Sequence, residues 1–98
     1  MAPITDAQVE RVRALVATIP PGRVSTYGDI ASAAGLSSPR IVGWIMRTDS
    51  ADLPWHRVIT ASGRPAAHLA TEQLELLRAE GVLSDDGRIP LSQVRFAF

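Results

Sequence analysis

The first stretch of the chain places apolar residues at helical spacing and predicts a helix that runs to about Thr18. The apolar positions are Val9, Val12, Leu15, Val16 and Ile19. Thr5 and Gln8 stand ahead of this run at the spacing of a capping box, in which each side chain accepts a hydrogen bond from the other residue's backbone N–H. The helix stops at Ile19-Pro20-Pro21-Gly22, because neither proline can donate a hydrogen bond to a continuing helix.

Two shorter amphipathic stretches follow and predict a helix-turn-helix. Thr26 is the expected N-cap of the first helix, and Gly35 is a natural residue for its end. Ser38 and Pro39 supply the N-cap and first turn of the second helix, which is expected over residues 40 to about 47. Its apolar positions are Ile41, Val42, Ile45 and Met46. A helix-turn-helix has many users besides DNA-binding proteins, so the motif alone does not define a function.

The second half of the chain predicts short strands around one further helix. Residues 54–59 read as a loop entering a strand, because Pro54 opens the run and β-branched residues close it. A helix opens at Thr71 or Glu72, with Leu74, Leu76 and Leu77 facing inward. Residues 82–83 and 89–91 read as a hairpin around an Asp-Gly turn. We therefore expect a single α+β domain over residues 1–98, winged-helix-like, with a helix-turn-helix, short strands and a C-terminal hairpin.

The amino-acid composition excludes several classes of protein. The chain has no cysteine, which excludes disulfides, thiolate metal sites and a cysteine nucleophile. No apolar run approaches the roughly 20 residues that a membrane span needs, and residues 1–6 show no secretion signal, so a cytoplasmic protein is expected. The formal net charge is zero, and every basic residue other than histidine is Arg. A nucleic-acid binder of this composition would have to gather its arginines on one face.

The sequence Leu53-Pro54-Trp55-His56-Arg57-Val58-Ile59 carries the most chemistry, although alone it fits a buried strand with a core Trp. Three other motifs accompany it, namely Ile19-Pro-Pro-Gly-Arg-Val-Ser-Thr-Tyr-Gly-Asp-Ile-Ala31, Arg40-Ile-Val-Gly43 and Leu76-Leu-Arg-Ala-Glu-Gly81. Together the four motifs closely resemble the DNA-binding, C-terminal domain of O6-alkylguanine-DNA alkyltransferases, over about residues 9–91. Trp55 stands where the transferases carry the alkyl-accepting cysteine. Pro-Trp-His-Arg is instead the pattern of the alkyltransferase-like proteins, which bind O6-alkylguanine without removing the alkyl group.

The resemblance assigns DNA contacts to the helix-turn-helix. It implies that Tyr27 presses on the phosphate beside the damaged nucleotide and that Arg40, behind the Ser38-Pro39 cap, takes the place of the flipped base. Gly43 would allow close approach to the minor groove, with helix–helix packing as an equal alternative, and Arg47 is a phosphate contact or an ordinary surface charge. Trp44 is bulky for a groove-facing position, so either it faces the core or the helix seats differently on DNA.

The resemblance also implies a lesion pocket beside the helix-turn-helix. Its members are Tyr27, Met46, Trp55 with Val58 behind it, and His68 at the lip. His56 and Glu80 match the pair that activates the transferase nucleophile, so here a structural hydrogen bond is expected, with Arg57 bracing the site. Asp49 replaces an asparagine that braces the helix-turn-helix in the transferases. Two histidines without a partner cluster make a poor metal site, and no cofactor is expected.

These features favour a non-enzymatic, monomeric sensor of DNA damage. By resemblance it would bind duplex DNA containing O6-alkylguanine, flip that nucleotide through the minor groove and hand the lesion to nucleotide excision repair proteins. Two alternatives remain open. One is a winged-helix transcriptional regulator that reads undamaged sequence in the major groove as a dimer. The other is an enzyme, either a residual transferase or a hydrolase using His56 and Glu80.

Overall fold

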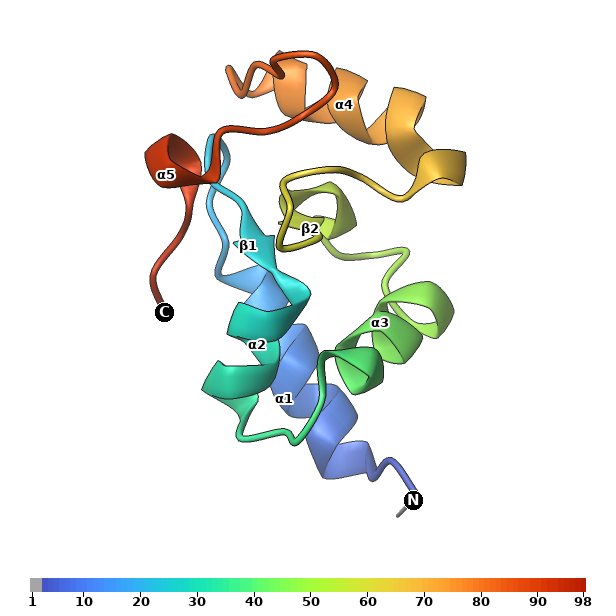
Figure 1. Cartoon of the computed structure of the whole chain (residues 1–98). Coiled ribbons are helices and arrows are strands. Elements are labelled where there is room, and N and C mark those ends of the chain that lie inside the picture. Colours follow the sequence, from blue (N-terminus) through green and yellow to red (C-terminus); the bar gives the residue numbers. More distant parts are fainter. Residues whose placement is uncertain (1–2) are drawn as a thin grey trace.

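The computed structural model describes residues 3–98, and it gathers three helices at one end of the molecule and a fourth at the other, with two short strands between them (Figure 1). Met1 and Ala2, on which the expectation of no secretion signal partly rests, lie outside the described residues. The elements are α1 (Asp6–Ala17), β1 (Ser25–Thr26), α2 (Tyr27–Ala34), α3 (Pro39–Thr48), β2 (Val58–Ile59), α4 (Ala70–Ala79) and α5 (Leu91–Val94), with 3-10 turns η1 (Trp55–Arg57) and η2 (Ala67–Leu69).

The capping signals in the sequence set the ends of the first three helices. In the capping box of α1, Gln8 N donates to Thr5 Oγ1 over 3.1 Å and Thr5 N donates to Gln8 Oε1 over 2.9 Å. Asp29 N donates to the Thr26 hydroxyl at the start of α2, and Gly35 ends that helix with a φ of 71°. The expected helix-turn-helix is therefore present, and α3 begins with Ser38 as N-cap and Pro39 in the first turn, as predicted.

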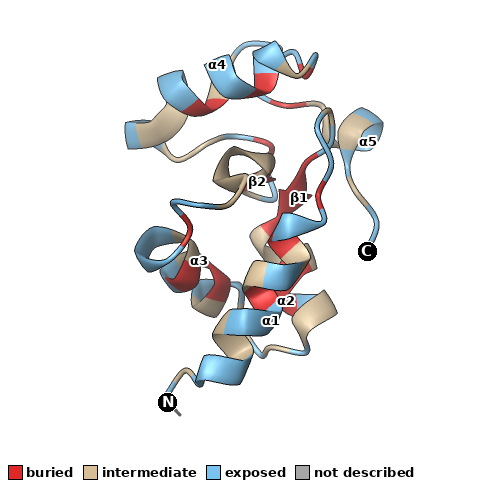
Figure 2. Ribbon diagram, turned by 180° about the vertical axis from the view of Figure 1, so that it is seen from behind, coloured by how far each residue is buried: buried red, intermediate tan, exposed pale blue. Residues whose placement is uncertain are grey.

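Helices α1, α2 and α3 enclose one of two core clusters (Figure 2). It is built from the buried residues Val12, Val16, Ile19, Ile30, Ala31, Val42, Ile45 and Val58. A second cluster joins the strands to α4 and the C-terminal segment, through Val24, Ile59, Leu77, Val82 and Ile89. Because Val58 belongs to the first cluster and the adjacent Ile59 to the second, β2 connects the two halves of the molecule.

Strand β2 is shorter than predicted. It pairs in parallel with β1 only through Ser25 with Val58 and Thr26 with Ile59, while Trp55–Arg57 form a 3-10 turn. Residues ahead of Val58 would need to pair with residues ahead of Ser25. Both segments turn away from the ladder there, because Arg57 N–H donates to Pro54 O over 3.0 Å and Arg23 N–H donates to Pro20 O over 3.2 Å. The prediction of a strand through residues 55–57 was therefore wrong.

The C-terminal third also differs from the prediction. Helix α4 begins at Ala70, and it buries Gln73 and Leu77 while Leu76 is 38% exposed, so the inward assignment of Leu76 was wrong. The expected hairpin is reduced to one antiparallel bridge, Asp85 with Arg88, around Asp86 and Gly87 at positive φ. Ile89 N–H donates to Gly63 O instead of to residues 82–83, and the chain then coils into α5.

Residues 3–98 contain no helix that is long and apolar enough to cross a membrane. In the same part of the chain, no three or more His, Cys, Asp or Glu side chains come together as a group that could bind a metal ion.

Candidate nucleic-acid interface

Glu80, at the C-terminal end of α4, holds two residues of the η1 turn. Its Oε2 atom lies 2.9 Å from His56 Nε2 and accepts from Arg57 Nη2 over 2.6 Å, and Arg57 Nε donates to Oε1 over 3.0 Å. Arg57 also donates through Nη1 to Ile19 O, just after α1, over 2.9 Å. The expected hydrogen bond between His56 and Glu80 is therefore present, and Arg57 ties η1 to both α4 and α1.

This arrangement fixes the charge of the Glu80 carboxylate. The Arg57 guanidinium, and then the His56 ring, lower the pKa of Glu80 from 4.5 to about 2 by hydrogen bonding to its charged form. The Glu80 side chain is only 16% exposed, and those of His56 and Arg57 are 14% and 15% exposed. The group is a charge-assisted network of three nearly enclosed side chains, and bidentate binding by arginine fixes the carboxylate in orientation.

Sequence reasoning missed Gln73, which holds the same turn from the other side. Its side chain is 3% exposed, and Nε2 donates to the carbonyls of His56 (3.0 Å) and Val58 (2.8 Å). A pattern signal was available, because Gln73 lies one turn before Leu77 on the apolar stripe of α4. A polar residue on such a stripe needs a buried partner, and here the partner is the backbone around Trp55.

The two aromatic residues of the predicted pocket flank the small sheet. Tyr27 is the first residue of α2, directly after β1, and Trp55 opens the η1 turn that leads into β2. Tyr27 is half-buried against the first core cluster, and burial raises the pKa of its hydroxyl. The Trp55 indole is also half-buried and meets the His56 ring edge to face, with centroids 6.1 Å apart.

The other predicted pocket residues differ in exposure. Val58 is 1% exposed and belongs to the first core cluster, and its expected position behind Trp55 stays a prediction. Met46 is half-buried against the first core cluster. His68 lies in η2 and is exposed. The structure thus places Trp55 and His56 in contact, while the grouping of Tyr27, Met46, Trp55 and His68 into one pocket stays a prediction.

The outer face of helix α3 carries two arginines, a glycine and a tryptophan. Arg40 and Arg47 are exposed, and a Cβ added at Gly43 would meet no atom within 4 Å. The alternative that Gly43 serves helix–helix packing is therefore wrong, since the space beside it is open. Trp44 is 45% exposed, so of the two possibilities left by the sequence, burial in the core is excluded.

The arginines separate into those engaged within the protein and those left free. Most guanidinium groups donate to a carboxylate or a backbone carbonyl. Within residues 3–98, those of Arg40, Arg47 and Arg78 make no hydrogen bond or ion pair. Two of these three lie on α3. Although the protein has no net charge, two arginines without a hydrogen-bond partner therefore lie on α3, the helix to which the family resemblance assigns the DNA contacts.

Asp49 does not brace the helix-turn-helix alone. Arg13, from α1, donates through Nη1 to Asp49 O over 2.7 Å and pairs with Asp52 through Nη2 and Oδ2 at 2.6 Å. Ser50 Oγ also donates to Met46 O. The loop after α3 is therefore fastened to α1 by Arg13, a residue that sequence reasoning did not single out.

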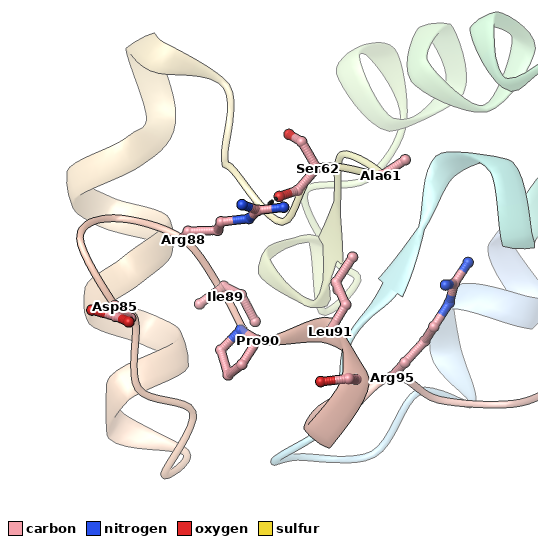
Figure 3. A pocket seen from close by; sticks show the side chains of 9 residues that line it. Ala61, Ser62, Asp85, Arg88, Ile89, Pro90, Leu91 and Arg95 are labelled. Carbon is pink, nitrogen blue, oxygen red and sulfur yellow. Dashed lines mark hydrogen bonds between the residues drawn. The ribbon is translucent and has the colours of Figure 1, made fainter.

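One hollow of about 480 Å³ lies away from these residues, between the loop at Ala61-Ser62 and the segment from Asp85 to Arg95 (Figure 3). Arg88 reaches across it and donates from Nε to Ser62 O over 2.8 Å. None of the predicted site residues lines this hollow. It therefore adds nothing to the candidate interface.

Comparison with known proteins identifies the class of this domain. The sequence model of the family "6-O-methylguanine DNA methyltransferase, DNA binding domain" matches residues 7–82, and the chain belongs to that family. Among curated relatives, the DNA base-flipping protein of Escherichia coli K12 is 39% identical over 101 residues, covering 95% of this chain and 77% of the relative. Alkyltransferase-like protein 1 of Schizosaccharomyces pombe is 40% identical over 74 residues, covering 68% of each chain.

Comparison with solved structures points to the same family. Schizosaccharomyces pombe Atl1 in complex with damaged DNA containing O6-carboxymethylguanine matches with a TM-score of 0.84 at 30% identity, covering 98% of this chain and all of that one. The Mycobacterium tuberculosis O6-methylguanine methyltransferase matches with a TM-score of 0.67 at 32% identity, covering 85% of this chain and 53% of that one. The family resemblance drawn from the sequence motifs and the helix-turn-helix fold are confirmed.

Proposed function

We propose that this protein is a non-enzymatic sensor of O6-alkylguanine in duplex DNA. It binds in the minor groove, turns the damaged nucleotide out of the helix and holds it against Trp55. The single observation that carries the proposal is Trp55 beside a His56–Glu80–Arg57 network. The family resemblance assigns Trp55 to the position of the alkyl-accepting cysteine. The proposal draws support from relatives named for base flipping and for alkyltransferase likeness, and from the likeness to Atl1 bound to damaged DNA.

The outer face of α3 supplies the DNA contacts in this proposal. Gly43 leaves room for the sugar-phosphate walls to approach the helix, and Arg40 lies one turn away, next to the N-terminal cap. A planar guanidinium can stack in place of an extruded base and bond to its orphaned partner. Pro39 pre-sets the first turn that positions Arg40, and Arg47 provides a phosphate contact at the other end of the face.

Tyr27, Met46, Trp55 and His68 form the pocket for the extruded guanine in this proposal. Stacking of a base on an aromatic side chain contributes about 1–3 kcal/mol and tolerates different substituents, which suits a sensor of varied alkyl groups. Tyr27 starts α2 beside the pocket and presses on the adjacent phosphate. Gln73 and Arg57 hold the η1 backbone, so that the indole of Trp55 stays in one orientation.

The same site is a poor catalyst. The chain has no cysteine to accept an alkyl group. Glu80 is held as a carboxylate by Arg57, with a pKa of about 2, which makes it too weak a base to activate a water molecule near neutral pH. Transfer of the lesion to nucleotide excision repair proteins, a monomeric state and a cytoplasmic location complete the proposal, and they rest on the family resemblance.

A binding titration at stated salt tests this proposal, using matched duplexes with and without one O6-methylguanine. Tighter binding to the damaged duplex is expected, and Arg40→Ala and Trp55→Ala should each abolish the difference. Arg78→Ala is the matched control, because it removes an equally uncommitted arginine from α4 and should leave the difference intact. Equal affinity for both duplexes would refute the sensor and favour a transcriptional regulator. Mass spectrometry that detects an alkyl adduct on the protein would refute the non-enzymatic assignment.

A further inference from the structure

Trp44 is the largest side chain on the outer face of α3, and the proposed function gives it no role. It is 45% exposed, although its neighbours Val42 and Ile45 are buried. A single exposed apolar residue on a protein surface needs no explanation by itself. The setting of Trp44 is different, because it lies four residues after Arg40 and three before Arg47. Helical geometry places all three side chains along one stripe of α3.

The charges around Trp44 indicate the chemistry of a partner that would bind over the exposed indole. Arg40 and Arg47 are two of the three arginines whose guanidinium groups have no partner within residues 3–98. The first turn of α3 contains no acidic residue, and Asp49, just beyond its end, is already paired with Arg13. An aromatic ring between two uncommitted cations suits a polyanion with apolar surfaces between its charges, which describes nucleic acid.

We infer that Trp44 is a DNA-contacting residue that packs against the sugars and base edges of the minor groove. This inference rests on the proposed function, because it places the outer face of α3 on duplex DNA. With a rise of about 1.5 Å per residue, Trp44 lies about 6 Å along α3 from Arg40, a distance of about two base-pair steps. The indole thus meets the duplex next to the extruded nucleotide and not in the lesion pocket.

The chemistry of the indole determines what this contact contributes. Its faces are apolar and pack on deoxyribose or enter between bases as a wedge, as apolar side chains do in bent minor-groove complexes. Its ring N–H can donate to the acceptors that every base pair presents at the minor-groove floor. Neither interaction displaces counterions, so this part of the affinity is independent of salt, in contrast to the phosphate contacts of arginine.

The test measures affinity against salt concentration for Trp44→Ala on both the plain and the O6-methylguanine duplex. We expect binding to both duplexes to weaken by about five- to a hundredfold, with an unchanged slope of log K against log salt. Trp44→Phe should retain part of the affinity. Leu83→Ala is the matched control, because it removes a 65% exposed apolar side chain outside α3 and should leave binding unchanged.

A fluorescence measurement keeps the inference testable if Trp44→Ala unfolds. The chain has two tryptophans, so Trp55→Phe leaves Trp44 as the sole indole, and plain duplex should protect it from quenching by acrylamide. Unchanged affinity of Trp44→Ala for both duplexes, or undiminished quenching with DNA bound, would overturn the inference. Equal affinity of the unmodified protein for both duplexes, together with a loss in Trp44→Ala, would refute the lesion sensor and uphold the Trp44 contact.

Discussion

Arg57 and His56 share the carboxylate of Glu80, with Arg57 Nη2 at 2.6 Å and His56 Nε2 at 2.9 Å from the same oxygen atom. Arg57 Nε also donates to the other oxygen, Oε1, so that both oxygens of the Glu80 carboxylate accept hydrogen bonds. These contacts connect the C-terminal end of α4 to the η1 turn, whose first residue is Trp55.

Glu80→Gln should reduce stability in a pH-dependent way. The folded-state pKa of Glu80 is about 2 against 4.5 ordinarily, so its contribution is fully present above pH 4.5 and is lost as the pH falls towards 2. The difference corresponds to about 3 kcal/mol in the free energy of unfolding at neutral pH. Urea denaturation at several pH values should show this loss near pH 7 and its disappearance near pH 2. Glu75→Gln, on the exposed part of α4, is the control, and an equal pH dependence in both variants would contradict the assignment.

Gly43→Ala should separate stability from DNA binding. The helix-interior glycine has open space beside it, so alanine should raise the free energy of unfolding by about 0.5–1 kcal/mol. The added methyl group would stand between α3 and the groove wall and should weaken duplex binding. Thermal unfolding and a titration of the same preparation measure both effects. A variant that is more stable and binds DNA unchanged would show that α3 does not approach DNA at this residue.

Gln73→Leu should destabilise the fold although leucine suits the surrounding core. It leaves the buried carbonyls of His56 and Val58 without their side-chain donor, and each unsatisfied group costs about 1–3 kcal/mol. We expect a loss of at least about 2 kcal/mol in chemical denaturation and weaker selection of the damaged duplex. Gln93→Leu, at an exposed position, should change stability by less than about 0.5 kcal/mol. Similar effects of the two substitutions would refute the bracing role of Gln73.

Arg47→Ala should lower the salt dependence of DNA binding. Each phosphate neutralised by an arginine contributes about 0.9 to the slope of log K against log salt. Removal of Arg47 should therefore reduce the slope by about one and weaken binding to plain and damaged duplex alike. Arg78→Ala changes the net charge by the same amount and should leave the slope unchanged. Equal slopes for the unmodified protein and Arg47→Ala would exclude the phosphate contact.

Local signals predicted the first half of the fold well. The helix ends depend on caps within a few residues, as at Thr5, Ser38 and Gly35, and such interactions can be recognised in sequence. The shape of residues 55–57 could not be found in this way. It is held by contacts from a helix distant in sequence, because Gln73 donates to the carbonyl of His56 and Glu80 binds the side chains of His56 and Arg57.

The same limit explains the residues that sequence reasoning missed. Arg13 and its carboxylate partners lie on α1 and on the loop after α3, and nothing in either segment alone indicates the pairing. The Asp85–Gly87 turn carries a hairpin signal that is locally correct, but Ile89 finds a backbone partner in Gly63 and the strands do not extend. Where a segment's hydrogen-bond partners are distant in sequence, the local pattern predicts the turn or strand that the segment favours but not the residues with which it pairs.

The pairing of Ser25 with Val58 and of Thr26 with Ile59 also joins the two segments that carry the aromatic residues of the candidate site. The two strands lie far apart in sequence, so a long loop must close, at a cost in entropy, before they can pair. Tyr27 follows β1 directly, and Trp55 opens the turn that leads into β2. Loss of these few backbone pairs would therefore separate Tyr27 from Trp55, although the three N-terminal helices would keep the local contacts that cap them.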